Sequence, residues 1–390
     1  MTSGGAEPLR FSVIVCSWQR PFWLKRCLRA LLQLDYPSFE VVVVADPPSL
    51  AQIDASQFKT VPFHDPNLSL ARNAGIAVSG GDVCAFIDDD SAAEPMWLAH
   101  LANGLKATGA AAAVGYVRGR NGISFQTRTS SIDREAETHE EPCEGAQPFV
   151  PRLAPGRAVK LIGTNMAIRR SVFAELGGFD PQYRYFLEDA DYSIRVSDAG
   201  RDICVIPDAE VHHSFASSSR RTRLRMPLSL FDIGRSTALF LRRYGPHLAD
   251  EIPARITLRE RKRLLRHMVL GTCEPGDIKR LLATLDAGWS DGMEATLSDV
   301  EAIPKNNQFH MVSAAPKGHK VIASRLFLNR GRAIRKANAI AGEGNRVSLF
   351  SFSLTPVRHH VAYTSDGVWL QKGGVFGRSD RDQPFVRWCR

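Results

Sequence analysis

The chain has 390 residues and the composition of an ordinary folded protein, with 44% hydrophobic and 23% charged residues. No apolar stretch approaches the roughly 20 residues that a membrane-spanning helix needs, and the first ten residues lack the apolar core of a signal peptide. Seven cysteines, an odd number without any Cys-x-x-Cys spacing, argue against a disulfide framework or a cysteine zinc site. We therefore expect a cytoplasmic protein, either free or in peripheral contact with the inner face of a membrane.

The net charge of +9 belongs to one end of the chain. Residues 311–390 contain 14 Lys and Arg against 4 Asp and Glu, while the first 310 residues are close to neutral. Such a segment suits an anionic partner, although it can also be only a solvated surface. No nucleic-acid-binding motif accompanies it. We therefore expect a membrane surface or an anionic glycan as its partner, and no nucleic acid.

The N-terminal region predicts a parallel βαβ unit. Phe11 to Cys16 and Phe39 to Val44 are apolar, β-rich runs, and apolar residues at helical spacing lie between them. A polar loop follows each strand, with Ser17 after the first and Asp46 after the second. Because the carboxyl ends of parallel strands meet at one edge of a sheet, these two side chains should lie close together.

The most informative stretch is Val83 to Ser91, where an apolar strand ends in three consecutive carboxylates. Side chains alternate along an extended chain, so Asp88 and Asp90 should point the same way and Asp89 away from them. An Asp-x-Asp pair can share one divalent metal ion, which would also compensate the repulsion between the acids. The alternative is a solvated acidic turn that caps a helix predicted over Ser91 to Gly104.

The segments on either side of this strand are less regular. Leu70 to Ala77 predicts a short helix, and its Arg72 is either a phosphate or ribose contact or simply a surface arginine. Gly119 to Pro155 is polar and irregular, which indicates a mobile loop or insertion rather than core. Val159 to Ile168 resumes strand character around Gly163-Thr164-Asn165.

A second acidic cluster, Glu188-Asp189-Ala190-Asp191, opens a predicted helix that ends near Gly200. Acids in the first turn of a helix are favoured by the helix dipole, so a structural role is available to all three. A short strand over Ile203 to Ile206 precedes Val211-His212-His213, of which at most one histidine is expected to be a ligand. Structural and chemical roles both stay open at this point.

The second half of the chain predicts helices and then a small unit with strands. Four arginines within Arg220 to Arg225 either close over a diphosphate or an anionic lipid-linked acceptor, or begin a solvated helix. Leu228 to Tyr244 and Leu258 to Leu285 have helical periodicity and could shape an acceptor site or rest on a membrane surface. From Lys320 onward, strand, basic helix and strand follow one another. We expect three parts: residues 1–225, 226–310 and 311–390.

Seven of these segments occur in the order that is found in the family-two inverting glycosyltransferases of GT-A fold, which the chain resembles from about Phe11 to Ser219. They are the two strands that precede Ser17 and Asp46, Ala71-Arg72-Asn73, Phe86 to Asp90, Gly177 to Asp180, Glu188 to Asp191, and Val211 to His213. Each motif alone is weak, and the shared order makes the resemblance specific. It implies an α/β protein with a Rossmann-like, mostly parallel GT-A sheet. The helical extension and the small C-terminal α/β unit, which the residue pattern predicts, lie beyond the resemblance.

The resemblance also implies a reaction of the kind used in polysaccharide biosynthesis. A sugar would move from a nucleotide-sugar donor to a hydroxyl of a glycan or lipid-linked acceptor, with inversion. Mn²⁺ or Mg²⁺ would be the cofactor, because a divalent cation stabilises the leaving nucleoside diphosphate. Its ligands would be Asp88, Asp90 and His213, with His212 as the second choice for the histidine.

The catalytic base is expected in the Glu188-Asp189 pair, with Asp189 as the first choice and Glu188 in reserve. A carboxylate is needed there because a sugar hydroxyl is a poor nucleophile until its proton is removed. The other expected site residues bind the nucleotide-sugar or lie on the acceptor side: Ser17, Arg20, Asp46, Arg72, Asp88 and Asp89 for the first role, and Asn165 and Asp191 for the second. Ala45 stands where the family commonly has an acid, so the base-binding role of Asp46 stays open.

Two other functions compete with this interpretation. A nucleotidyltransferase also uses paired acids on an α/β sheet, but the sequence lacks a Gly-rich phosphate loop with basic residues near the N-terminus. The third function is a non-enzymatic protein that binds anionic surfaces or nucleic acid, against which the basicity is confined to one end of the chain and lacks a known binding motif. Metal-dependent release of a nucleoside diphosphate from nucleotide-sugars discriminates the transferase from both.

Overall fold

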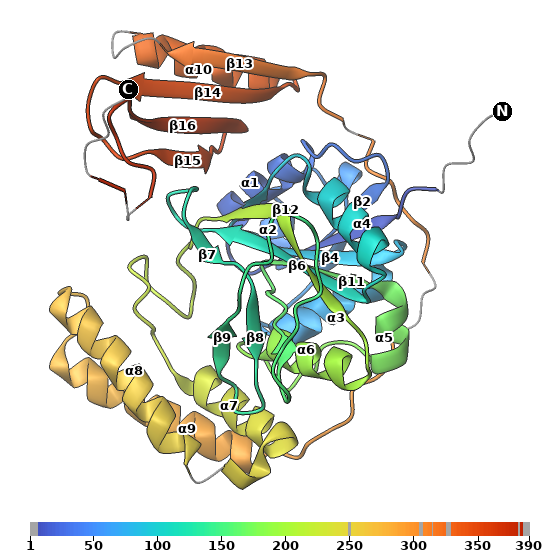
Figure 1. Cartoon of the computed structure of the whole chain (residues 1–390), viewed down its shortest axis with the longest axis vertical. Helices are drawn as coiled ribbons and strands as arrows, with labels where there is room; N and C mark the ends of the chain where they lie inside the picture. Colours follow the sequence, from blue (N-terminus) through green and yellow to red (C-terminus); the bar gives the residue numbers. More distant parts are fainter. Residues whose placement is uncertain are drawn as a thin grey trace.

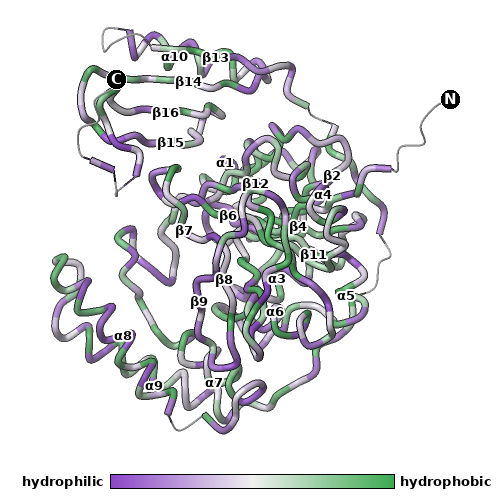
Figure 2. The backbone as a smooth tube through the Cα atoms, viewed as in Figure 1, coloured by the Kyte–Doolittle hydropathy of each residue, from purple (hydrophilic) through white to green (hydrophobic). Residues whose placement is uncertain are grey.

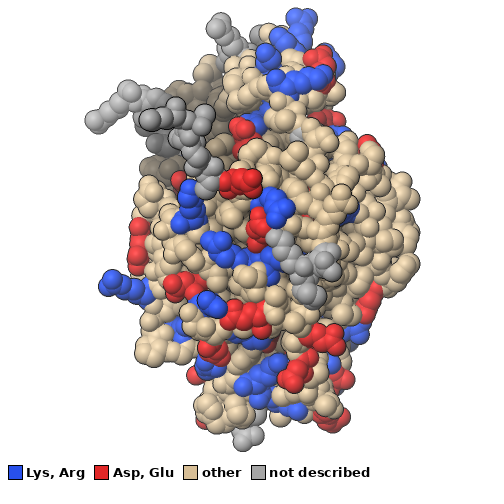
Figure 3. Space-filling view, turned by 90° about the vertical axis from the view of Figure 1, so that its right-hand side faces the viewer, with Lys and Arg blue, Asp and Glu red and all other residues tan. Residues whose placement is uncertain are grey.

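The computed structural model describes residues 7–248, 251–303, 307–313, 315–324, 329–380 and 383–384. A sheet flanked by helices lies at the centre, a pair of long helices lies at one end, and a small second sheet lies at the other (Figure 1). Apolar residues concentrate in the central strands, whereas α8 and α9 alternate between apolar and polar (Figure 2). Lys and Arg are interspersed with Asp and Glu over the face drawn in Figure 3. Within the described residues, no helix is both long and apolar enough to cross a membrane.

The central sheet has the strand order β3-β2-β1-β4-β11-β6-β12-β5. Its parallel first half contains four strands: β1 (Phe11–Ser17), β2 (Phe39–Ala45), β3 (Lys59–Pro62) and β4 (Val83–Asp88). The second half is mixed: β11 (Asn165–Arg169), β6 (Ala112–Arg118), β12 (Ile203–His213) and β5 (Ser91–Ala93). β12 runs in the same direction as β4, so the carboxyl ends of both strands reach one edge of the sheet.

Helices cover both faces of this sheet because successive strand residues point to opposite sides. Val13 and Val15 pack with one helix pair, α1 (Pro21–Leu31) and α4 (Trp97–Thr108). Ile14, between them, packs with the helices of the other face: α3 (Leu68–Val78), α5 (Arg170–Leu176) and α6 (Glu188–Asp198). The result is the three-layer arrangement in which open α/β sheets hold a ligand at the carboxyl edge.

The structure after the acidic strand differs from the sequence expectation in two respects. The helix expected from Ser91 starts only at Trp97, because Ser91–Ala93 pairs with β12 instead. Asp89 and Asp90 are buried, so the acidic stretch is not a solvated turn.

The stretch from Gly119 to Pro155 was expected to be a mobile loop or insertion outside the core, but part of it is buried in the core. It contains the edge strand β7 (Phe125–Thr127) and two strands of a small antiparallel sheet. That sheet consists of β8 (Ser130–Ile132), β9 (Thr138–Glu140) and β10 (Ala158–Val159). Ile132 is fully buried, so this part of the chain packs against the domain.

The helices that follow the sheet are α7 (Phe231–Tyr244), α8 (Ile252–Val269) and α9 (Pro275–Glu294). The arginine-rich segment before them is not the start of a helix, since α7 begins only at Phe231. Phe240 of α7 is buried beside Tyr183 and Ile194, which fixes the helices to the sheet domain. Leu264 of α8 and Leu281 of α9 lie in a core that the long helices share.

The C-terminal unit is a four-stranded sheet with one helix. Its elements are β13 (His319–Ser324), α10 (Arg330–Gly342), β14 (Arg346–Ser353), β15 (His360–Tyr363) and β16 (Val368–Gly374), with the strand order β13-β14-β16-β15. The unit rests on α1 and on the turn after it. Arg26 Nε of α1 donates to the Tyr363 carbonyl at 2.9 Å, and Gln33 Nε2 of the turn donates to the Gly367 carbonyl at 3.0 Å. The division of the chain at residues 225 and 310 stays a prediction.

Glu40, on β2, is a fully buried carboxylate that joins distant parts of the chain. Ser12 Oγ and Gly80 N each donate to it at 2.6 Å, His310 N donates at 2.7 Å, and Lys59 Nζ lies 2.9 Å away. Burial alone would raise the pKa of Glu40, but these donors outweigh burial and hold the pKa below its ordinary value. The carboxylate therefore ties the segment after the helices to the sheet.

We predict that Glu40→Gln lowers the free energy of unfolding by about 1–3 kcal/mol at neutral pH, because hydrogen bonds to a buried charge are lost. Since folding lowers the pKa of Glu40, its contribution is present above the ordinary pKa and disappears as the pH falls through the folded-state pKa. Urea unfolding of both proteins across this range should show the difference shrinking toward acid pH. Glu175→Gln, at an exposed pair with Arg201, is the control and should change stability little. A difference independent of pH would contradict the role of the charge.

Candidate active site

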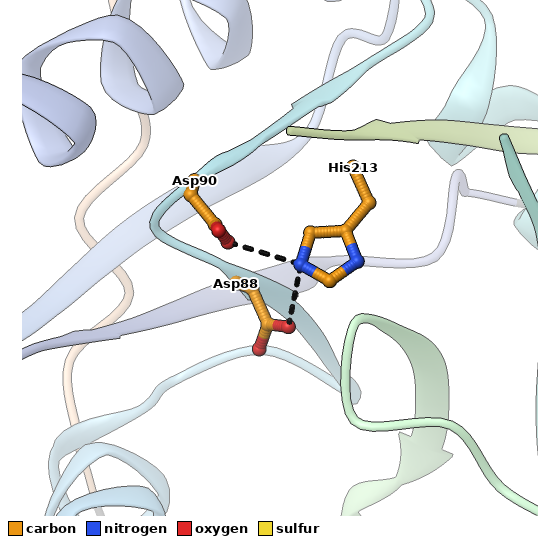
Figure 4. Close-up of side chains that lie close together, drawn as sticks. All are labelled: Asp88, Asp90 and His213. Atoms are coloured by element: carbon orange, nitrogen blue, oxygen red, sulfur yellow. Dashed lines mark ion pairs between the residues drawn. The ribbon is translucent and has the colours of Figure 1, made fainter. Parts of the chain in front are cut away.

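Asp88, Asp90 and His213 converge at the carboxyl edge of the sheet (Figure 4). His213 Nε2 lies 3.3 Å from Asp90 Oδ1 and 3.9 Å from Asp88 Oδ2. The register of β5 and β12 pairs Ser91 with His213, and this long-range pairing sets the histidine beside the acids. Asp88 and Asp90 thus point toward the same imidazole.

The hydrogen bonds around His213 fit a divalent metal ion. Nδ1 lies 2.9 Å from Gln126 Oε1, and when Nδ1 donates there, Nε2 presents its lone pair to the two carboxylates. Nε2 is buried and has no hydrogen-bond partner among the described residues. Two carboxylates and one oriented imidazole are a ligand set that suits Mn²⁺ or Mg²⁺, and Gln126 would orient the histidine from outside the set.

The neighbouring His212 belongs to a different group. Its Nε2 lies 2.9 Å from Glu94 Oε1, and its ring packs against Trp369 at 5.0 Å between centroids. Glu94, Glu210 and His212 also lie close enough to hold an ion, but Arg118 already pairs with Glu210 through two nitrogens. Of the two histidines, His213 is therefore the one that faces Asp88 and Asp90.

Asp89 faces away from the pair and is fully buried. Ser17 Oγ donates to it at 2.6 Å, and the Arg20 guanidinium binds it through Nε at 3.0 Å and through Nη2. Burial raises the pKa of Asp89, and Arg20 opposes this shift. Arg20 also lies 3.8 Å from Asp90. Asp89, held by Ser17, therefore fixes Arg20 beside the acids, and the nucleotide-sugar roles expected of Ser17 and Asp89 stay predictions.

A cavity of about 330 Å³ joins this group to the second acidic cluster. Asp88, Asp90 and His213 line it together with Glu188 and Asp189. The other charged or apolar wall residues relevant to a ligand are Arg20, Val44, Phe63, Arg72, Arg220 and Arg221. The cavity has the size of a small-ligand site with a few convergent polar groups.

Asp189 is held at the start of α6 by a strained turn. Phe186 and Leu187, just before it, have φ angles of 75° and 68°, which non-glycine residues seldom adopt. Gly163 N donates to Asp189 Oδ2 at 3.1 Å, and Thr164 Oγ1 donates to Asp88 Oδ2 at 2.6 Å. Because Gly163 and Thr164 are adjacent, one short loop positions both Asp189 and Asp88 in the wall of the same cavity.

Glu188 lies deeper and is paired with Arg72. Arg72 Nη1 lies 2.9 Å from Glu188 Oε1, and both side chains are buried. Burial and the neighbouring Asp189 raise the pKa of Glu188, while Arg72 acts in the opposite direction. A Cβ at Gly163 would lie 2.1 Å from Arg72 Nη2, so the glycine leaves the room that this ion pair needs.

Residues 12–177 match the family model described as "Glycosyl transferase family 2". Over these residues the chain is similar to glycosyltransferase family 2. The family is inverting, and the α/β sheet described above is its GT-A fold.

Named relatives share part of the chain. The succinoglycan biosynthesis protein ExoM of Rhizobium meliloti is 29% identical over 223 residues, which are 53% of this chain and 67% of ExoM. The glucosyl-dolichyl phosphate glucuronosyltransferase of Haloferax volcanii is 29% identical over 182 residues, or 44% of this chain and 56% of that protein. A crystal structure of GalNAc-T7 with UDP, GalNAc and Mn²⁺ has a TM-score of 0.48 and 15% identity, covering 72% of this chain and 55% of that one. The chain thus spans between about half and two thirds of these proteins.

The two residues expected on the acceptor side, Asn165 and Asp191, make hydrogen bonds within the protein. Asn165 is fully buried, accepts from Trp97 Nε1 at 2.8 Å and donates to two backbone carbonyls. Asp191 is fully buried, accepts from Tyr244 Oη at 2.8 Å and pairs with Arg195 at 2.9 Å. Neither lines the cavity, and the acceptor-side role of both stays a prediction.

Asp46 also has its hydrogen bonds within the protein. It caps the short helix α2 (Pro47–Leu50) through Ser49 N at 3.1 Å and accepts from Gln19 N at 2.6 Å. Gln19 has a φ of 55°, so this bond holds the strained loop that carries Arg20. Asp46 does not line the cavity and supports the loop that does.

Sequence reasoning missed Gln126 and Thr164. Gln126 lies in the stretch that was expected to be loop, and Thr164 lies in a segment expected to be strand. Gln126 contacts His213 and Thr164 contacts Asp88, in each case across segments far apart in the chain. A local sequence pattern does not predict such contacts.

We predict that His213→Ala weakens Mn²⁺ binding by more than the tenfold to hundredfold that loss of an orienting neighbour typically costs. Gln126→Ala, which removes only that neighbour, should fall within this range. Titration of the full chain with Mn²⁺, followed by electron paramagnetic resonance, measures both. His212→Ala is the matched control and should bind Mn²⁺ almost as the unchanged protein does. Loss of binding in the His212 variant with retention in the His213 variant would reverse the assignment.

Proposed function

We propose that the chain transfers a sugar from a nucleotide-sugar donor to a hydroxyl of a glycan or lipid-linked acceptor, with inversion at the anomeric carbon. The observation that supports this proposal is a single cavity lined both by carboxylates that could hold a metal ion and by a carboxylate that could act as a base. Asp88 and Asp90 share it with His213, as a metal-bound diphosphate requires, and Asp189 enters it from another element. Similarity to family 2 supports the same reaction class.

The donor end of the proposed site uses the metal group and two arginines. Mn²⁺ or Mg²⁺ held by Asp88, Asp90 and His213 would supply positive charge to the leaving diphosphate. Arg20, fixed beside Asp90, and Arg221, on the cavity wall, offer guanidinium forks to phosphate oxygens. The apolar wall that includes Val44 and Phe63 suits a nucleobase.

Asp189 is the proposed base. Its oxygens accept hydrogen bonds from Gly163 N and Ala190 N, which orient the carboxylate and leave lone pairs for the acceptor hydroxyl. Direct attack by that hydroxyl inverts the anomeric carbon, so the reaction needs no enzyme nucleophile. Glu188 is less suited to the role because it is buried in its ion pair with Arg72.

A lipid-linked acceptor is the class that we favour. The printed name of the Haloferax volcanii relative states that it acts on a glucosyl-dolichyl phosphate, and we extend this acceptor class to the present chain as a proposal. The helical part and the C-terminal unit, residues 226–310 and 311–390, would then serve the acceptor rather than the donor.

Donor hydrolysis tests the proposed function. The full chain is incubated with a panel of UDP-, GDP- and dTDP-sugars with Mn²⁺ or Mg²⁺, and free nucleoside diphosphate is measured. We expect release from at least one donor and loss of release with a chelator, because diphosphate departure depends on the cation. With added pyrophosphate, formation of a nucleoside triphosphate and a sugar 1-phosphate would instead favour a nucleotidyltransferase, and no turnover of any donor under either condition would count against both enzymes.

We predict that Asp189→Asn lowers the transfer rate by about 10² to 10⁴, because it keeps the shape of the side chain and removes its basicity. The donor dissociation constant should hardly change, since the donor is assigned to other residues. Asp65→Asn, at a half-exposed acid of the same cavity, is the matched control and should keep its activity.

The alternative base is tested with Glu188→Gln. This variant should lose stability through its buried partner Arg72 and should keep more transfer activity than Asp189→Asn. An inactive but folded Glu188 variant beside an active Asp189 variant would assign the base to Glu188.

A further inference from the structure

Helix α8 is buried on only one side. That side packs into the core shared with α9 through Ile252, Ile256 and Leu264. On the opposite side Leu258, Leu265 and Val269 are 53%, 38% and 84% exposed. At about 100° per residue these three fall within an arc of roughly 40°, so they form one apolar ridge along the helix. The helix lies at the outer edge of the molecule (Figure 1).

Positive charge flanks this ridge without compensation. Arg261, Lys262 and Arg266 are exposed, and none has an ion-pair partner among the described residues. Glu260, an acid of the same helix, is buried and paired with Arg263. The exposed side of α8 therefore combines apolar side chains with cations and presents no carboxylate between Leu258 and Val269.

The same surface continues to the cavity through the loop before α7. Arg221 lines the cavity, and the exposed Leu224 follows on the same loop. Arg225 lies among like charges: burial lowers its pKa, and Arg221, Arg120 and Arg263 lower it further. Met226, the residue after Arg225, packs in the same core as Ile256 and Leu264 of α8, so the loop reaches the helix and its cations lie between the cavity wall and α8.

We propose that α8 and the Arg221–Arg225 loop form a docking surface for an anionic phospholipid bilayer. The ridge would enter the headgroup region, as the apolar face of an interfacial helix does, and the cations would bind lipid phosphates. A second copy of the chain is a poor occupant, because a two-fold contact would place these cations against themselves. The inference does not depend on the proposed transfer reaction. With that reaction, the cavity opens beside the membrane that carries a lipid-linked acceptor.

Vesicle sedimentation of the full chain tests the docking surface. We expect binding to vesicles of phosphatidylcholine with phosphatidylglycerol, weaker binding at high salt, and little binding to phosphatidylcholine alone. The variant Arg261→Gln, Lys262→Gln, Arg266→Gln should lose affinity by about fivefold per cation, or roughly 100-fold in all. A second variant, Leu258→Ser, Leu265→Ser, Val269→Ser, should lose at least about tenfold through the ridge. All six side chains are exposed, so both variants should fold, and circular dichroism checks this.

The matched control removes three exposed cations from α10, with Arg332→Gln, Arg335→Gln and Lys336→Gln, and should bind vesicles as the unchanged chain does. Loss of binding in this control alone would overturn the proposal, because the membrane contact would then belong to the C-terminal unit. Undiminished binding of both α8 variants, or no binding of the unchanged chain to anionic vesicles, would also overturn it. So would a dimer in light scattering that the ridge variant dissociates, since the face would then be a protein interface.

Discussion

Three adjacent carboxylates at the end of a buried strand are the constraint on which the site depends. Their repulsion is relieved by sending each to a different partner: Asp88 to Thr164, Asp89 to Arg20 and Ser17, and Asp90 to the Ala216 amide. Every one of these partners comes from another segment of the chain. Folding the acids into place therefore also assembles the surrounding wall, and a cation beside Asp88 and Asp90 would complete the compensation.

Backbone strain is concentrated around the same cavity. Gln19, Phe186, Leu187 and Phe215 are four of the six non-glycine residues with positive φ among the described residues. Each stands one or two positions from a residue of the site, and each such conformation costs of order 1 kcal/mol or more. Buried contacts hold these turns in place. The Phe215 ring, for example, packs on the His213 ring with 4.3 Å between the ring centroids. The strain fixes the direction in which the site side chains point.

Much of the fold could be predicted because it follows from local pattern. β4 and the acids after it were predicted from an apolar run and its abrupt end, and the opposite directions of Asp88 and Asp89 follow from the period of a strand. Contacts between segments far apart in the chain could not be predicted from the sequence. Residues 91–93 pair with β12 as strand β5, although a helix was expected to begin there. Gln126, which contacts His213, lies in a stretch whose sequence pattern predicted no strand. The internal hydrogen bonds of Asn165 and Asp191 were unforeseen for the same reason, since their partners come from distant segments.

Charge illustrates the same difference between sequence and structure. The sequence concentrates its positive excess in residues 311–390 and leaves the rest near neutrality, which draws attention away from α8. The net charge of a segment, however, does not show which of its cations lack an ion-pair partner. On α8, Arg255 and Arg259 are neutralised by Glu135 and Glu137 of the small sheet region, whereas the cations that flank the apolar ridge are left unpaired among the described residues. A nearly neutral part of the chain can therefore carry a strongly basic face, and tertiary ion pairs decide on which side that face lies.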